Sequence, residues 1–229
     1  MSTKRKTTRE PQYQRSLDLQ QQGGLTSLGL MTNQAWQDDP KHLLFTLARY
    51  KFVAKMLAGC GHALEVGCAD AFGTRIVVQA VKKLTAVDFD PVFVEDVNRR
   101  MDPRWRFACH QHDLLAGPVA GNFDAAYALD VIEHIAPAQE LAFVGNIVRS
   151  LTPHGLLLLG TPSLESQAHA GPASKAGHVN CKDGGGLKTL LGRFFHNVFV
   201  FSMNDEVVHT GYYPMAHYLL GLACTRRDA

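Results

Sequence analysis

Two short apolar runs, separated by a small-residue turn and a helical stretch, constrain the fold of this chain more than any other feature. The first run covers residues 63–66 and leads into the loop 67–74; a helical pattern follows at 75–83, and the second run ends at Asp88. This order predicts a strand, a tight turn, a helix and a strand. Parallel strands need such a crossover, whose handedness is nearly fixed, so both strands end at the same edge of the sheet. Ligands of open α/β sheets bind at that edge.

An acid at the end of the second run predicts a nucleoside ligand. Asp88 lies 21 residues after Gly67, close to the roughly 20 expected for an acid that binds ribose hydroxyls. The loop does not read G-x-G-x-x-G, because Ala69 and Ala71 stand where a pyrophosphate would need bare backbone. Glu65 would also point a negative charge towards it. We therefore expect a nucleoside joined to a cationic amino acid, with Glu65 stabilising either the turn or the ligand's ammonium group.

The same loop carries a family resemblance. Glu65-Val66-Gly67-Cys68-Ala69-Asp70 resembles the first motif of class I S-adenosylmethionine-dependent methyltransferases, usually E-x-G-x-G-x-G, and Val87-Asp88 resembles their ribose-binding acid. Alanine replaces the second and third glycines. It is small enough to keep the turn tight, but we expect ordinary φ values there. An α/β turn that binds no ligand is the alternative interpretation of this loop.

Two later loops match the same family. Asp113 and Leu114 follow the strand expected at residues 105–109, where the resemblance implies contacts with adenine; Asp113 could instead cap the next turn. Residues 129–135 follow the strand expected at 122–128 and read L-D-V-I-E-H-I. The form D-x-x-E-H-I is common in the family and would place polar groups where the donor's methyl group points.

The resemblance implies a small-molecule methyltransferase of the D-x-x-E-H subgroup, with S-adenosylmethionine as cofactor and S-adenosylhomocysteine as product. We expect methylation of an oxygen on a sugar, a polysaccharide precursor or another small metabolite. The residues expected to contact the cofactor are Glu65, Gly67, Cys68, Ala69, Asp88, Phe89, Asp113, Leu114, Leu129 and Asp130.

Histidine is the expected proton acceptor, because a hydroxyl must lose its proton during or after attack and histidine titrates near neutral pH. His134 and His178 are the leading candidates for this catalytic role; Tyr212, Tyr213 and His209 are weaker candidates for acceptor contacts. The spacing also resembles the metal-binding pattern of small-RNA terminal 2′-O-methyltransferases, with aspartate in place of the first glutamate. A divalent metal on Asp130, Glu133, His134 and His178 is thus an alternative that we do not favour, and we assign no metal ligand.

The resemblance implies one α/β domain: a Rossmann-like, doubly wound, seven-stranded sheet, mostly parallel, with one antiparallel C-terminal strand and helices on both faces. We expect residues 1–24 to be a disordered polar and basic tail and residues 25–229 to form the domain. Within it, residues 25–58 form an N-terminal helical cap. The long loop 163–186 is expected to be a lid that recognises the acceptor.

Composition limits the partners. The net charge is only +2 among 229 residues, so nucleic acid is an unlikely partner, and no apolar run approaches the roughly 18 residues of a membrane span. The five cysteines form no C-x-x-C pair, which favours a reduced, cytoplasmic setting. A small-molecule acceptor is the expected partner. A homodimer, RNA methylation and a non-catalytic nucleoside-binding module of the same fold are left open.

Overall fold

A single eight-stranded sheet organises the molecule. The computed structural model describes residues 6–227, and its strands follow the order β3-β2-β1-β4-β5-β8-β6-β7. Their bounds are β1 His62–Val66, β2 Lys83–Asp88, β3 Ala108–Gln111, β4 Phe123–Leu129, β5 Leu151–Pro162, β6 Phe195–Asn204, β7 Val207–His209 and β8 Tyr218–Arg226. The order reverses between β1 and β4, which makes that position the topological switch point where ligands of such sheets bind.

The directions of the strands confirm the doubly wound prediction. Strands β1 to β5 pair in parallel, whereas β8 is inserted antiparallel between β5 and β6. The prediction of seven strands was wrong by one, because β7 adds a three-residue antiparallel edge to β6. Three residues are too few to show a strand periodicity, and the partner that orders them lies on the preceding strand.

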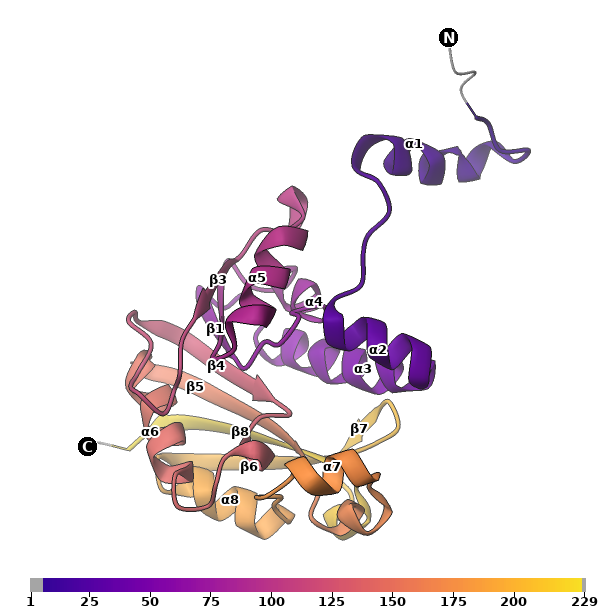
Figure 1. Cartoon of the computed structure of the whole chain (residues 1–229). Coiled ribbons are helices and arrows are strands. Elements are labelled where there is room, and N and C mark those ends of the chain that lie inside the picture. Colours follow the sequence, from indigo (N-terminus) through magenta and orange to yellow (C-terminus); the bar gives the residue numbers. More distant parts are fainter. Residues whose placement is uncertain (1–5, 228–229) are drawn as a thin grey trace.

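Helices cover both faces of the sheet (Figure 1). The cap helices are α2 Leu30–Asp38 and α3 Pro40–Met56, and the others that pack here are α4 Thr74–Val78, α5 Pro91–Arg100, α6 Glu140–Ser150 and α8 Gly184–Gly192. One buried cluster joins α3, α4 and α5 to the sheet, and a second joins α6 and α8 to the opposite face. No helix within residues 6–227 combines the length and apolarity needed to cross a bilayer.

Local sequence explains where the main helices begin. Asp39 precedes α3 and its side chain accepts a hydrogen bond from the Lys41 amide, with Pro40 in the first turn. Asp90 and Pro91 repeat this arrangement at α5, where the Asp90 carboxylate accepts from Val92. Such caps satisfy amides that the helix itself leaves unpaired. They fix the points at which the chain leaves the sheet and returns to it.

Several predicted boundaries differ from the structure. The helix expected at 75–83 is shorter, because β2 begins at Lys83, and the strand expected at 105–109 starts later, since Pro103–Trp105 forms the short helix η2. The segment 163–186 is not one irregular loop: it contains η4 Glu165–His169 and α7 Pro172–Gly177. Its role as a lid stays a prediction.

The N-terminal segment stands apart from the sheet and its helices (Figure 1). Helix α1 Gln14–Gly23 follows η1 Pro11–Tyr13, and no residue of either is buried. Isolated helices shorter than about 12 residues are marginal in water. The expected disorder of residues 1–24 stays a prediction, of which residues 1–5 lie outside the described part.

Ile147 tests the packing of α6 against the sheet. Its side chain is fully buried in the cluster that joins α6 and α8 to the sheet. We expect Ile147→Ala to lower the free energy of unfolding by about 2–5 kcal/mol, because it removes buried methyl groups and leaves a cavity. Leu141→Ala, on the exposed side of the same helix, should change it by less than about 0.5 kcal/mol. Urea unfolding of both variants measures this difference, and equal losses would contradict the assigned packing.

Candidate active site

The loop after β1 adopts the tight turn that its glycine and alanines suggest. Gly67 has φ 69°, and a Cβ there would lie 2.4 Å from Cγ2 of Val131 in the loop after β4. Only glycine therefore fits this close approach. The expectation of ordinary φ at the alanines was wrong: Ala69 and Ala71 have φ 45° and 50°. Both alanines occupy the left-handed region, which costs a residue with a Cβ roughly 1–2 kcal/mol.

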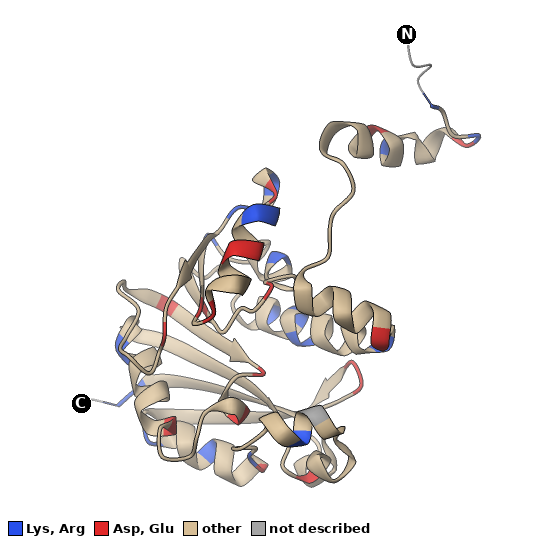
Figure 2. Ribbon diagram, viewed as in Figure 1, with Lys and Arg blue, Asp and Glu red and all other residues tan. Residues whose placement is uncertain are grey.

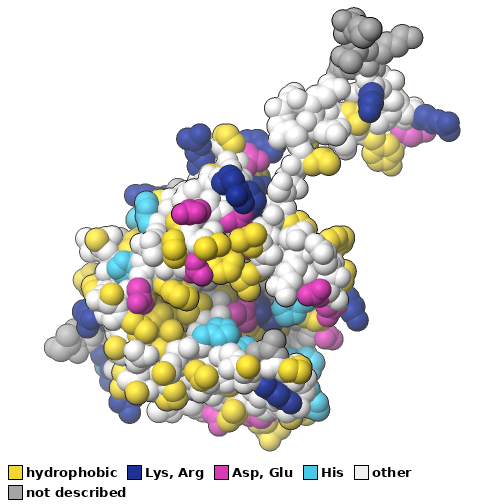
Figure 3. All heavy atoms as spheres, in the orientation of Figure 1, with side chains coloured by type: hydrophobic (Ala, Val, Ile, Leu, Met, Phe, Trp, Pro, Cys, Tyr) yellow, Lys and Arg dark blue, Asp and Glu magenta, His cyan; other side chains and the backbone are white. Residues whose placement is uncertain are grey.

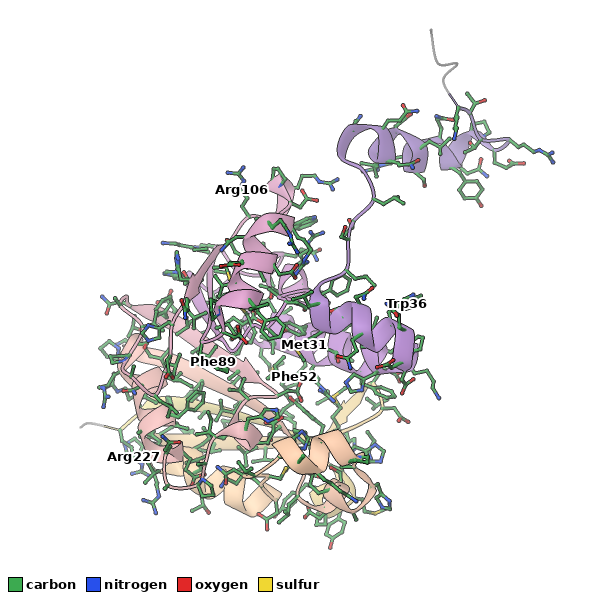
Figure 4. The ribbon with its side chains drawn as sticks, in the orientation of Figure 1. Met31, Trp36, Phe52, Phe89, Arg106 and Arg227 are labelled. Carbon is green, nitrogen blue, oxygen red and sulfur yellow. The ribbon has the colours of Figure 1, made fainter. Side chains whose placement is uncertain are left out.

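Asp88 closes this loop from the neighbouring strand. It is buried, and its carboxylate accepts hydrogen bonds from the amides of Ala69 at 2.8 Å and Asp90 at 2.9 Å. Each carboxylate oxygen keeps a further lone pair, so ribose hydroxyls can still bind. Phe89, the next residue, is 70% exposed (Figure 4).

The adenine contacts expected beyond β3 stay a prediction. The Asp113 carboxylate accepts a hydrogen bond from the Leu115 amide at 2.8 Å, so the residue does cap the following turn. Leu114 is buried against the α6 side of the sheet. Both residues follow β3 at the carboxyl edge, in line with Asp88 at the end of the adjacent β2.

Glu65 turns away from the ligand edge and anchors the cap. Its carboxylate accepts hydrogen bonds from the Tyr50 hydroxyl of α3 at 2.9 Å and from the Thr74 hydroxyl at 2.7 Å. The side chain is buried under α3 and α4. Burial raises the pKa of Glu65 to about 7, against the effect of these hydrogen bonds. Of the two roles expected for Glu65, the structure places it in the one that stabilises the turn.

Two further carboxylates hold the cap. Asp70 accepts a hydrogen bond from the Thr32 amide of α2 at 2.7 Å. Asp130, after β4, accepts two from a single nitrogen of Arg49 on α3: Nη1 lies 2.9 Å from Oδ1 and 2.7 Å from Oδ2. These contacts of Thr32, Tyr50 and Arg49 could not be predicted, because the cap helices carry no motif. The available signal was Arg49 itself, the single arginine of the stretch 40–56, which also carries three lysines.

A cavity of about 650 Å³ opens between the cap and the carboxyl edge of the sheet. Figure 3 shows this face hollowed between the cap and the α7 segment, with histidine side chains nearby. Of the predicted cofactor contacts, Gly67, Cys68, Ala69, Leu129 and Asp130 line the cavity. The other five (Glu65, Asp88, Phe89, Asp113 and Leu114) are not among its lining residues. Its volume lies within the range of small-molecule sites.

The two predicted catalytic histidines face each other in this cavity. The rings of His134 and His178 lie 5.2 Å apart. Nδ1 of His134 lies 2.9 Å from the Gly177 carbonyl, and Nδ1 of His178 lies 2.9 Å from Oε1 of Gln167. Because both partners are oxygen acceptors, Nδ1 is the donor in each contact, and the corresponding tautomer has its lone pair on Nε2. By contrast, His209, Tyr212 and Tyr213 are not among the residues that line the cavity.

Glu133 completes a group that could hold a metal. One ligand atom from each of Glu133, His134 and His178 lies within 4.8 Å of the others. Glu133 is fully buried, and its Oε1 finds no hydrogen-bond partner among the described residues. Burial, helped by the charge of Asp130, raises the pKa of Glu133 to about 8. A proton or a cation would satisfy this carboxyl, so the donor set fits a divalent ion. Asp130 is not part of the group.

Comparison with known proteins identifies the segment that carries the motifs. Residues 63–155 match a family model described as a methyltransferase domain. Nodulation protein S from Rhizobium tropici is 27% identical over 139 residues, which cover 58% of each chain. The chain therefore spans little more than half the length of that relative.

Two solved structures share the fold. The N-methyltransferase NodS from Bradyrhizobium japonicum WM9, in complex with S-adenosyl-L-homocysteine, superposes with a TM-score of 0.58 at 19% identity, covering 85% of this chain and 91% of its own. The methyltransferase domain of bacterial CtHen1-C superposes with a TM-score of 0.64 at 18% identity, covering 79% and 98%.

The buried Glu65 predicts a pH-dependent stability. Its pKa rises from 4.5 in the unfolded chain to about 7 in the fold. The protonated Glu65 carboxyl is the form that the fold favours. Its contribution to the free energy of unfolding is fully present below pH 4.5 and is lost as the pH rises through 7. Glu65→Gln should remove this loss, on the order of 3 kcal/mol between these limits. Urea unfolding from pH 4.5 to 8 would show it as a difference between wild type and variant. Parallel pH profiles would contradict the assignment.

Proposed function

Because the chain carries a class I S-adenosylmethionine-dependent methyltransferase domain, we propose that it transfers a methyl group from this cofactor to a hydroxyl or amino group of a small polar molecule, such as a sugar or polysaccharide precursor. The observation that carries the proposal is the His134–His178 pair beside the loops after β1 and β4.

Both histidines are prepared to accept a proton. Methyl transfer from a sulfonium is an in-line displacement, and the attacking hydroxyl, or the ammonium formed once a neutral amine has attacked, must give up a proton. Burial and the neighbouring His134 lower the pKa of His178, which keeps this imidazole neutral near pH 7. With Nδ1 donating to Gln167, the lone pair of Nε2 is free for the acceptor's proton. The protein otherwise contributes by aligning the acceptor and excluding water.

The lining of the cavity supports a small polar acceptor. Ser166, Gln167, His169 and Ser174 come from the 163–186 segment, and His42 comes from the cap. These side chains offer hydrogen-bond donors and acceptors of the kind that recognise hydroxyl and amino groups. The NodS neighbour is an N-methyltransferase, which supports nitrogen as the target atom, whereas our expectation from sequence was oxygen. The identified product will decide between them.

The group formed by Glu133, His134 and His178 favours a second candidate, a metal-dependent RNA 2′-O-methyltransferase. A divalent ion there would lower the pKa of an acceptor hydroxyl. Against this candidate, arginines near the end of α5 are paired with carboxylates: Arg99 and Arg100 with Asp96, and Arg104 with Asp102. Basic and acidic positions lie close together in this part of the chain (Figure 2). Pairing weakens the attraction of these arginines for phosphates.

Turnover tests the first candidate. Wild-type protein with methyl-labelled S-adenosylmethionine should methylate a member of a panel of sugars and amino sugars. His178→Ala and His134→Ala should each lower kcat roughly 100- to 10,000-fold, the usual loss of a general base, while binding of S-adenosylhomocysteine is kept. His154→Ala, at the opposite end of β5, is the control. Full activity of both cavity variants would contradict the proposed role, and cofactor binding without turnover on any substrate would favour a non-catalytic module.

Metal binding tests the second candidate. If it is correct, calorimetry should detect Mn²⁺ or Co²⁺ binding that Glu133→Gln weakens at least tenfold, because the variant loses a charged ligand. Glu165→Gln, an exposed carboxylate on η4, should bind the ion as wild type does. A chelator should then abolish methylation of an RNA terminal 2′-hydroxyl. Sugar methylation that a chelator leaves unchanged would exclude the metal from catalysis.

A further inference from the structure

The cap turns apolar side chains towards the cavity at a regular spacing. Four of them line it, here called the apolar strip: Met31 and Ala35 of α2, and Leu43 and Leu47 of α3. Residues four apart lie on the same face of a helix, so each pair forms a stripe along its own helix.

The connection between the two helices brings these stripes together. Asp39 alone joins α2 to α3, and the two helices pack side by side as a hairpin (Figure 1). Ala35 and Leu43 are each four residues from Asp39. Met31 and Leu47 are each eight residues from it. The short turn therefore matches the two stripes in register along the wall of one cavity.

Much of the apolar strip is accessible to solvent. Met31 is 53% exposed, and Leu43 and Leu47 are only partly buried. Apolar surface in contact with water carries a free-energy cost roughly proportional to its area. A ligand that covers the strip with an apolar group would therefore gain affinity.

The other side of the cavity is polar. The hollow seen in Figure 3 lies between the cap and the α7 segment, and residues 163–186 contribute Ser166, Gln167 and His178 to it. His42 and Thr46 of the cap also line the cavity, so hydrogen-bonding groups border the strip. One ligand molecule can thus present a polar group to the 163–186 segment and an apolar group to the cap.

The methyl donor does not match the apolar strip. S-adenosylmethionine carries a sulfonium and a zwitterionic amino acid, and its ribose is expected at Asp88. Such groups would lose hydration against leucine and methionine side chains without gaining hydrogen bonds. Its adenine is expected beyond β3, at Asp113 and Leu114, which do not line this cavity. The acceptor is the molecule left to cover the strip.

We propose that the methyl acceptor is amphipathic: its hydroxyl or amino group lies beside His134 and His178, and an alkyl or aryl substituent covers the apolar strip. Four residues of a helix span about 6 Å, which suits a short alkyl chain or one aromatic ring. A sugar joined to such a group is an acceptor of this class. This inference rests on the proposed function, because it adds a second contact to the same acceptor.

Glycosides that differ only in their alkyl group test the inference. The probes are methyl and hexyl glucosides and their 2-amino analogues, added to protein saturated with S-adenosylhomocysteine. A fully buried methylene strengthens binding about fourfold, and the strip stays partly open to water. The hexyl compounds should therefore bind about 10- to 100-fold more tightly than the methyl compounds in calorimetry. The same ratio is expected in kcat/KM for methyl transfer.

Met31→Gln and Leu43→Gln should each reduce this ratio at least about threefold, because glutamine is of similar size and removes apolar surface. Binding of the methyl compounds should stay within about twofold of wild type. Met31 is more than half exposed, so its variant serves if the leucine variant does not fold. Leu44→Gln is the matched control and should keep the wild-type ratio, since Leu44 is 54% exposed on α3 but does not line the cavity.

Equal binding of the methyl and hexyl compounds by wild type would overturn the inference and leave the proposed function standing. Equal weakening of both by Met31→Gln would mean that the strip only holds the cap, and a ratio that neither cavity variant changes would place the alkyl group elsewhere. Either result would also overturn it. Binding of S-adenosylhomocysteine without binding of any glycoside would overturn it together with the sugar as acceptor. If wild type did not bind S-adenosylhomocysteine, the proposed function itself would fail.

Discussion

Carboxylates beneath the N-terminal cap, two of them buried, hold the functional edge of this molecule together. Glu65, Asp70 and Asp130 each follow or end a central strand, and each accepts hydrogen bonds from a cap helix. Removing carboxylates from water is costly unless donors replace the lost hydration. The cap supplies those donors through Thr32, Tyr50 and Arg49. The loops that would hold the cofactor and the helices that cover it are therefore stabilised by the same contacts.

This arrangement divides the acidic residues into different roles. Glu65 and Asp70 organise the turn and the cap, and Asp88 closes the turn from β2 while keeping lone pairs for a ligand. Glu133 is the most completely buried of these acids; one of its oxygens has no hydrogen-bond partner within residues 6–227, and burial raises its pKa to about 8. The surroundings of each carboxylate, and not its residue type, separate these roles, because each carboxylate has a different set of hydrogen-bond donors around it.

The acceptor side is built from parts that lie far apart in the chain. His134 follows β4, whereas His178 comes at the end of α7, and each Nδ1 is held by an oxygen of the 163–186 segment. The same segment is bound to the short helix η3 Ile132–His134 after β4, since the amides of Val179 and Asn180 donate to the Glu133 carbonyl. These bonds orient both imidazoles towards one space. A motion of this segment would change the spacing of the two rings and the shape of the acceptor site together.

The sequence by itself determined the doubly wound order, the antiparallel last strand and the loops that carry the cofactor motif. The parallel crossover and the loops follow from apolar runs, turn residues and acids at strand ends, all of which are local, whereas the antiparallel last strand was implied by the family resemblance of those loops. The eighth strand, the positive φ values of Ala69 and Ala71, the inward turn of Glu65 and the pairing of Arg49 with Asp130 were decided by tertiary structure. Each depends on a neighbour distant in sequence: a partner strand, the Asp88 carboxylate, or the cap helix. The local sequence pattern carries no information about such neighbours. Burial against them sets both the backbone conformation of the loop and the charge of the acidic side chains.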